Sequence, residues 1–316
     1  MKKQIRQTKV CVYTGTRAEY GLLHWLLKAL KDDPAFELNL VVTGAHLSPE
    51  YGLTYRQIQD DGFNIDRKLE MLLSSDSDAA ITKSTALALS GMADIFQETA
   101  PDLLILLGDR YEILAAACAA MFFKIPIAHL YGGERTEGLI DEAVRHSVTK
   151  MAHIHFVANE AYRKRVIQLG EKPESVHVVG SLGLENVRKT ELHSKAAFEE
   201  ALGIKLKKRN LLITYHPVTL DRKTSARQIQ DLLSVLDELD DTHLLFTKSN
   251  ADADSRIINR MIDQYVADNP DKASAHTSLG HVLYLSALQW VDGVVGNSSS
   301  GIIEAPSFKI GTVNIG

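Results

Sequence analysis

The sequence predicts an α/β fold built from two doubly wound, Rossmann-like domains. Short apolar runs typical of buried strands alternate with amphipathic helical segments along the chain. Turns that contain glycine and polar residues follow these apolar runs in both halves of the sequence. A length of 316 residues is ample for two domains.

In the first half, an amphipathic helix is predicted over residues 21–31, where Leu22, Trp25, Leu26 and Leu30 form one apolar stripe. Further helices are predicted over residues 113–123 and 141–153. The predicted strands cover residues 9–13, 37–42, 102–107, 125–130, 154–158 and 176–179. Apolar strands that alternate with helices indicate a parallel sheet covered on both faces.

The second half repeats this alternation. Helices are predicted around Leu233, Ile258, Leu285 and Ile303. The predicted strands cover residues 210–215, 243–247, 274–277, 291–295 and 310–315. Charged helical sequence between Gly180 and Arg209 separates the two sets of strands, so we assign residues 1–183 to an N-terminal domain and 184–316 to a C-terminal nucleotide-binding domain.

Composition excludes some classes of partner. Hydrophobic residues make up 45% of the chain, and 35 basic against 40 acidic residues give a net charge of −5. This balance is not that of a protein that binds nucleic acid or an anionic membrane surface. The sequence has no apolar run of about 18 residues, and residues 1–4 lead directly into a strand, so we expect a cytoplasmic protein. Cys11 and Cys118 lie in apolar segments and are expected to be reduced.

Two turns, one in each half, are typical of phosphate binding. Residues 294–301 read Val-Val-Gly-Asn-Ser-Ser-Ser-Gly, a strand end followed by a short helix, and Glu304 follows one helical turn later. Residues 10–17 form a similar strand and glycine turn that ends in Arg17. Hydroxyls, backbone N–H groups and a helix start suit a diphosphate, and a carboxylate at Glu304 suits a ribose.

Polar clusters follow the other predicted strands. Gly108-Asp109-Arg110, Gly132-Gly133-Glu134 and Tyr215-His216-Pro217 each begin where an apolar run ends. In doubly wound folds the carboxyl ends of the strands face the ligand. Asp109, Glu134, Asp141 and His216 therefore form a set that can move a proton on and off carbon, provided that burial perturbs the pKa of at least one carboxylate.

Each of these residues also has a structural interpretation when it is taken singly. Asp109 and Arg110 suit an ion pair or a helix cap, Glu134 an ordinary turn, His216 a core position and Asp141 a helix cap. His153 and His155 share one face of a strand, but no cluster of cysteines or carboxylates with ligand spacing accompanies them. We assign no metal site.

Seven polar segments follow one another along the chain. They are Gly-Thr-Arg-Ala-Glu-Tyr at 15–20, His-Leu-Ser-Pro-Glu-Tyr-Gly at 46–52, Gly-Asp-Arg at 108–110, Gly-Gly-Glu at 132–134, Ile-Asp-Glu-Ala-Val-Arg-His at 140–146, His-Pro-Val-Thr at 216–219 and Gly-Asn-Ser-Ser-Ser-Gly at 296–301. In this order they resemble the hydrolysing UDP-N-acetylglucosamine 2-epimerases of sialic-acid biosynthesis, and the resemblance covers nearly the whole chain. The segment at His216 favours the hydrolysing branch over the non-hydrolysing epimerases.

The resemblance implies a GT-B-like fold with UDP in the cleft between the domains and no metal or redox cofactor. It implies anti elimination of UDP from UDP-N-acetylglucosamine to give 2-acetamidoglucal, followed by hydration to N-acetylmannosamine. It implies catalytic roles for Asp109, Glu134, Asp141 and His216. Substrate contacts are expected from Arg17, Glu19, His46, Arg110, Arg145, Asn297, Ser298, Ser299 and Glu304. We also expect a homodimer or homotetramer.

Family members continue beyond the strand at 310–315 through an arginine-containing loop and closing helices, and we expect such a segment to matter for activity. Three alternatives stay open at the level of sequence. The first is the same reaction on a UDP-2,4-diacetamido-2,4,6-trideoxyhexose. The second is a GT-B glycosyltransferase, which the density of carboxylates in the first domain disfavours. The third is a protein that binds a UDP-sugar without turnover.

Overall fold

The computed structural model describes residues 6–220 and 224–315, so residues 1–4, which we expected to lead into the first strand, lie outside the described part. The chain divides into two compact units, residues 1–182 and 183–316. Along the described residues, no helix is both long enough and apolar enough to cross a membrane.

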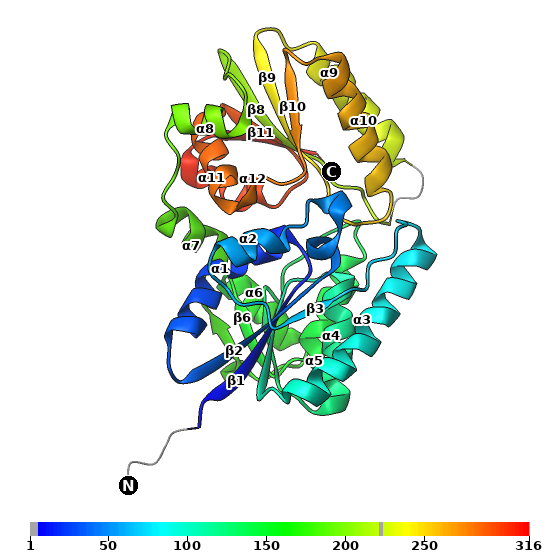
Figure 1. Cartoon of the computed structure of the whole chain (residues 1–316), viewed down its shortest axis with the longest axis vertical. Coiled ribbons are helices and arrows are strands. Elements are labelled where there is room, and N and C mark those ends of the chain that lie inside the picture. The colour runs from blue at the N-terminus through cyan, green and yellow to red at the C-terminus, as the bar shows by residue number, and fades with distance from the viewer. Residues whose placement is uncertain (1–5, 221–223, 316) are drawn as a thin grey trace. The chain divides into compact units, whose positions relative to one another are not determined.

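The first unit contains a seven-stranded sheet in which all neighbouring strands are parallel (Figure 1). Its strand order is β3-β2-β1-β4-β5-β6-β7. The strands are β1 (Thr8–Thr14), β2 (Phe36–Thr43), β3 (Arg67–Leu69), β4 (Leu103–Leu107), β5 (Ile127–Leu130), β6 (Ile154–Val157) and β7 (Val176–Val178). The order reverses between β1 and β4, and ligands of such sheets bind outside the carboxyl ends at this switch point.

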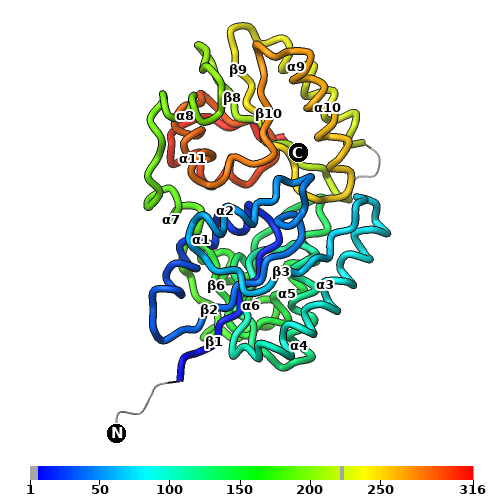
Figure 2. The backbone as a smooth tube through the Cα atoms, in the orientation of Figure 1, coloured from blue at the N-terminus to red at the C-terminus, as the bar shows by residue number. Residues whose placement is uncertain are grey.

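Helices cover both faces of this sheet. One face packs on α3, α4 and α5 through residues such as Tyr13 and Leu104, and the other packs mainly on α1 and α2 through residues such as Val12 and Leu40. The helices are α1 (Arg17–Asp32), α2 (Tyr55–Asp60), α3 (Asp78–Thr99), α4 (Tyr111–Phe123), α5 (Asp141–Met151), α6 (Glu160–Gln168) and the 3-10 turns η1 (Gly44–Leu47), η2 (Pro49–Tyr51) and η3 (Pro173–Ser175). Figure 2 shows α3 and α4 side by side. Cys11 is buried, Cys118 is partly exposed, and both are free thiols.

The second unit repeats the architecture with a five-stranded parallel sheet of order β10-β9-β8-β11-β12. Its strands are β8 (Arg209–Thr214), β9 (Thr242–Thr247), β10 (Ala273–His276), β11 (Gly293–Gly296) and β12 (Gly311–Asn314). Its helices are α7 (Leu182–Lys189), which starts at the last residue of the first unit, α8 (Lys195–Leu202), α9 (Ser225–Asp237), α10 (Ser255–Asp268), α11 (Gly280–Trp290), α12 (Ser300–Ile303) and the 3-10 turn η4 (Ala305–Phe308). Ile213 and Phe246 face α9 and α10, whereas Leu212 and Leu245 face α8 and α11. The switch point lies between β8 and β11.

The predicted strands and helices are all present, with ends that differ by a few residues. Among the described residues, the helices α2, α3 and α6, the strand β3 and the 3-10 turns η1 to η4 were not predicted. The 22-residue helix α3 is the largest omission. Its buried stripe includes Ala80, Ser84 and Ala88, and such small residues pack closely on α4 without giving a strong amphipathic signal. The strand β3 has only three residues, none of them buried.

Candidate active site

Arg145 is the centre of a polar network at the carboxyl end of the first sheet. Its side chain is 2% exposed. Its Nε donates to Asp109 at 3.0 Å, and Nη2 also donates to that carboxylate. Nη1 donates to the Glu134 carbonyl at 3.1 Å and to Glu142 at 2.6 Å, and Nη2 donates to Thr136 Oγ1 at 2.8 Å. Burial acts to lower the pKa of Arg145, but Asp109 and Glu142 raise it above its ordinary value, so the guanidinium stays charged.

The pKa of Glu134, which lies beside this network, is raised. Burial raises its pKa to about 7, the neighbouring Asp109 adds to the rise, and Arg145 opposes it. A carboxyl group with this pKa can both give and take a proton near neutral pH. The proton transfer expected from the sequence depends on at least one carboxylate with a perturbed pKa, and Glu134 is such a carboxylate.

The glycine pair before Glu134 is required by close approach of the backbone. Gly133 has φ +77°, and a Cβ there would lie 2.5 Å from the Tyr162 carbonyl oxygen. Its own carbonyl accepts a hydrogen bond from Arg165 Nη1. Contacts of Gly133 with Tyr162 and Arg165 therefore fix the turn between β5 and Glu134, and this turn sets the position of Glu134.

His129 supports Asp109, and sequence reasoning did not identify it. The ring is fully buried in β5, and its Nε2 donates to the carbonyl of Gly108 at 2.7 Å, directly before Asp109. Nδ1 lies 3.2 Å from Thr149 Oγ1. Burial lowers the pKa of His129 to about 4, so the ring is neutral at physiological pH. A histidine inside an otherwise apolar strand was the only signal in the sequence.

Asp141 is the first residue of α5, and Ile140 occupies the N-cap position. The structural interpretation of Asp141 as the cap is therefore not supported. Asp141 is partly buried and lies one helical turn before Arg145. Glu142, beside it, accepts from Thr136 N at 2.7 Å, and although burial opposes the change, this bond and Arg145 hold its pKa below the ordinary value.

The turn after β1 is closed by Glu19. Glu19 Oε2 accepts from Gly15 N at 2.6 Å and Thr16 N at 3.1 Å, and Thr16 Oγ1 accepts from Glu19 N, which makes a capping box at the start of α1. Burial, and after it the neighbouring Glu112, raise the pKa of Glu19 to about 8. The second oxygen, Oε1, is buried and has no hydrogen-bond partner among the described residues. Arg17, the first residue of α1, is partly buried.

Two other predicted substrate contacts have protein partners in this structure. Arg110 is paired with the fully buried Glu112, with Nε and Nη2 each 3.2 Å from a carboxylate oxygen. His46 is fully buried, with Nε2 3.1 Å from Thr14 Oγ1 and Nδ1 2.7 Å from Thr54 Oγ1. Burial lowers the pKa of His46 to about 3. These surroundings favour a structural role for His46.

Asn297 and His216 meet across the switch point of the second sheet. Asn297 Oδ1 accepts from His216 N at 2.7 Å, and Asn297 Nδ2 donates to the His216 carbonyl at 2.8 Å. The preceding residue, Gly296, has φ +139°, and a Cβ there would overlap the carbonyl of Thr214. The side chain of Asn297, which was predicted to contact substrate, thus holds the backbone of His216.

The serine turn that follows begins a helix of a single turn, α12. The helix α12 ends at Ile303, and the 3-10 turn η4 that follows has Pro306 in its first turn, where proline cannot continue an α-helix. The helix dipole expected at this turn is therefore small, and hydroxyls and N–H groups are the main donors. Ser298 Oγ accepts from Ser300 N at 3.4 Å, and Ser299 is exposed at the N-cap position.

Glu304 and Tyr284 form the buried side of this turn. Glu304 is 9% exposed, and burial raises its pKa above the ordinary value. Its carboxylate touches the backbone at Gly183, where a Cβ would overlap Oε1. Tyr284 was not identified from the sequence. Burial raises the pKa of its hydroxyl to about 12, and Glu304 adds to the rise.

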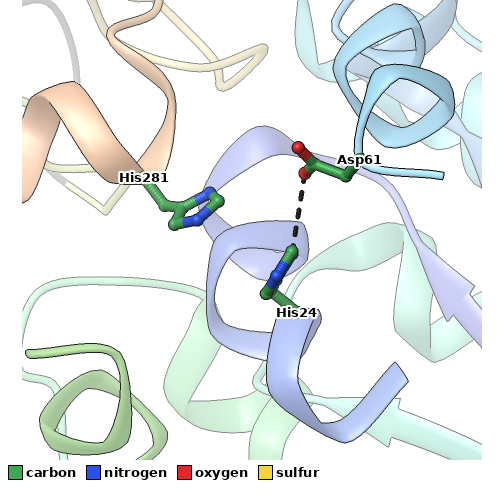
Figure 3. A group of neighbouring side chains, drawn as sticks. All are labelled: His24, Asp61 and His281. Atoms are coloured by element: carbon green, nitrogen blue, oxygen red, sulfur yellow. Dashed lines mark ion pairs between the residues drawn. The ribbon is translucent and has the colours of Figure 1, made fainter. Parts of the chain in front are cut away.

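Three histidines outside these clusters, His24, His153 and His155, pair with protein groups. His155 Nε2 lies 3.3 Å from Glu171, and His153 Nδ1 accepts from Ile127 N at 3.3 Å. Figure 3 shows His24 of α1 facing Asp61, which follows α2, with 3.5 Å between Nδ1 and Oδ2. Tyr20 of α1 donates to the same carboxylate, so these residues fasten α1 to the segment after α2.

The first unit therefore brings Asp109, Glu134 and Arg145 together, and the second brings His216 to Asn297. Two parallel α/β sheets with polar clusters at their carboxyl ends define the GT-B-like class of fold. The UDP-N-acetylglucosamine 2-epimerase of Methanocaldococcus jannaschii, solved in complex with UDP-N-acetylglucosamine and UDP, has this fold with a TM-score of 0.80 and 18% identity, over 97% of this chain and 83% of that one.

The family follows from the sequence comparisons. The chain belongs to the UDP-N-acetylglucosamine 2-epimerase family, whose model matches residues 28–316. It is 43% identical over 308 residues to GDP/UDP-N,N'-diacetylbacillosamine 2-epimerase (hydrolyzing) of Campylobacter jejuni, over 98% of this chain and 80% of that protein. It is 41% identical over 309 residues to polysialic acid biosynthesis protein P7 of Escherichia coli, over 98% of this chain and 78% of that protein. The chain is a hydrolysing nucleotide-sugar 2-epimerase.

Proposed function

We propose that the protein converts a UDP-linked 2-acetamido sugar and water to UDP and the free sugar epimerised at C2. The observation that carries this proposal is the network in which the buried Arg145 holds Asp109 beside Glu134, whose pKa is raised to about 7. Elimination needs a base that removes the C2 proton, and hydration needs an acid that returns a proton to C2. A glycosyltransferase needs neither step.

The reaction proceeds in two balanced steps. A carboxylate takes the C2 proton while the C1–O bond breaks and UDP leaves, which gives a 2-acetamidoglucal. Water then adds its oxygen to C1, C2 receives a proton on the opposite face, and the surplus proton goes to solvent. We assign the proton transfers to Asp109, Glu134 and Asp141.

The second unit supplies donors for the leaving group. Ser298, Ser299 and the backbone N–H groups of their turn are suited to phosphate oxygens, and His216 is placed beside them by Asn297. Glu304 offers a carboxylate for the ribose hydroxyls. Arg17, at the start of α1 in the first unit, carries a positive charge that suits a phosphate group.

For the sugar itself, the Campylobacter relative named for diacetylbacillosamine favours UDP-2,4-diacetamido-2,4,6-trideoxyglucose. UDP-N-acetylglucosamine, the substrate expected from the sequence, is the second candidate. Both share the 2-acetamido group and the C2–H bond that the chemistry requires.

UDP release without any acceptor tests the function. Incubation with either UDP-sugar should yield equal amounts of UDP and free 2-epimer by chromatography. Release of UDP only when an acceptor is added would indicate a glycosyltransferase, and binding without release would indicate a protein without turnover. UDP at about 100 times its Kd should stabilise the protein by about 2.7 kcal/mol. Uridine, which lacks the phosphates, should stabilise it much less.

A further inference from the structure

A cavity of about 580 Å³ lies in the first unit, beyond the carboxyl ends of β2 and β3. Its wall begins at Gly44, which directly follows β2, and includes Glu70, which directly follows β3. Leu87 closes another side from α3. Its volume is within the range of pockets that hold small ligands.

The lining residues determine what kind of group fits. Leu47, Met71 and Leu87 provide apolar surface, and Glu50 and Glu70 provide carboxylates. None of the described residues that line the cavity is basic. A diphosphate would therefore be repelled, whereas an uncharged group with methyls and N–H donors would be accommodated.

Gly44 relates the cavity to the segment after β4 that carries Asp109 and Arg110. Gly44 has φ +57°, and a Cβ there would lie 3.0 Å from the Gly15 carbonyl oxygen and 3.2 Å from Glu112 Oε1. Glu112 pairs with Arg110, the residue after Asp109. In the sheet, β2 is two strands from β4, which is about 10 Å. A hexose with an acylamino substituent is long enough to span this separation.

The wall that carries Leu47 and Glu50 is fixed by buried contacts. His46 joins the end of β1 to Thr54 through its two ring nitrogens, and Tyr20 packs edge-on against its ring with centroids 6.3 Å apart. Tyr20 also donates to Asp61. The cavity therefore belongs to a preformed part of the first unit.

We propose that this cavity receives the substituents at C4 and C6 of the sugar and selects a 4-acylamino-6-deoxy sugar over one with hydroxyls at both positions. The C6 methyl and the acyl methyl would contact Leu47, Met71 and Leu87, and the C4 amide N–H would donate to Glu50 or Glu70. This inference rests on the proposed function, because it assumes that the ligand is a UDP-linked 2-acetamido sugar.

The test compares kcat/KM for UDP-2,4-diacetamido-2,4,6-trideoxyglucose and UDP-N-acetylglucosamine in the wild type, Leu87→Gln and Glu70→Gln. Leu89→Gln is the matched control, because Leu89 is also exposed on α3 and does not line the cavity. The wild type should prefer the diacetamido sugar by about 10-fold or more, and Leu87→Gln should lower that preference about 10-fold. Glu70→Gln should lower it as well, and Leu89→Gln should leave it unchanged.

The outcomes separate the two proposals. Turnover of both sugars with the same preference in the wild type, Leu87→Gln and Glu70→Gln would overturn the cavity assignment and leave the proposed function intact. A wild-type preference for UDP-N-acetylglucosamine would also overturn it. A wild type that releases UDP from neither sugar would overturn the proposed function, and the cavity assignment with it.

Discussion

Asn297 spans the switch point of the second sheet by binding both backbone polar groups of His216, with hydrogen bonds of 2.7 and 2.8 Å. The Asn297 side chain thereby joins the first residue after β11 to His216, the second residue after β8. His216 and Asn297 belong to two segments, 216–219 and 296–301, that follow strands and were expected to face the substrate. The geometry gives Asn297 the task of fixing where His216 stands.

Asn297→Ala removes both hydrogen bonds and leaves two backbone groups of His216 without these partners. We expect a loss of about 1–3 kcal/mol in the free energy of unfolding. UDP affinity, measured by calorimetry, should fall as well. Asn64→Ala removes only an exposed side-chain hydrogen bond and should change stability by less than about 0.5 kcal/mol. Equal effects of the two substitutions would contradict the role of Asn297.

Gly296→Ala should be far more damaging than Gly311→Ala, although both glycines end or begin strands of the same sheet. A Cβ at Gly296 would overlap the Thr214 carbonyl, and the residue has φ +139°. Gly311 has open space around its Cβ position. We expect a loss of more than about 4 kcal/mol, or failure to fold, for Gly296→Ala and near-neutral stability for Gly311→Ala in urea unfolding. Two variants of similar stability would show that the turn is built differently.

Glu19→Gln should remove part of the pH dependence of stability. The pKa of Glu19 is raised to about 8 in the folded chain, so the folded state keeps a proton that the unfolded state releases near its ordinary value of 4.5. Stability from this group is present at low pH and is lost as pH rises towards about 8, by up to about 1.4 kcal/mol per pH unit. Glutamine can still close the capping box. The free energy of unfolding, measured from about pH 5 to pH 8, should fall less steeply in Glu19→Gln than in the wild type. An unchanged slope would show that Glu19 is already ionised.

Glu134→Gln should lower activity by about 10²–10⁴-fold while UDP binding persists. Because the pKa of Glu134 is raised to about 7, the wild-type profile of kcat/KM against pH should show a limb near pH 7. The residual activity of Glu134→Gln should lack that limb. Glu137→Gln, which alters an exposed carboxylate three residues later, should keep both the rate and the limb. A limb that survives in Glu134→Gln would assign it to another group.

The two sheets were predictable because parallel strands that are buried on both faces appear in the sequence as continuous apolar runs. The strand-end residues Asp109, Glu134 and His216 were predictable for the same reason, since each follows such a run. The helix α3 was missed because the first half of its buried stripe consists of the small residues Ala80, Ser84 and Ala88, which give little periodic signal.

Partnership inside the clusters was much harder to predict. Arg145, Asn297 and His46 stand in motifs that suggest ligand contact, yet their polar atoms are directed at protein groups. His129 and Tyr284 act from buried positions within an apolar strand and an apolar helix. Such roles depend on which strands become neighbours, and short sequence motifs do not specify sheet order.

In the proposed reaction the C2–H bond of the sugar breaks and is re-formed with a solvent proton. The most direct test is proton NMR of the free sugar formed from the UDP-sugar in deuterium oxide. The product should carry deuterium at C2, and Asp109→Asn, Glu134→Gln and Asp141→Asn should each slow its appearance by about 10²–10⁴-fold. Full activity in all three variants would refute the assignment of the carboxylates. Product that keeps its original hydrogen at C2 would contradict the mechanism itself.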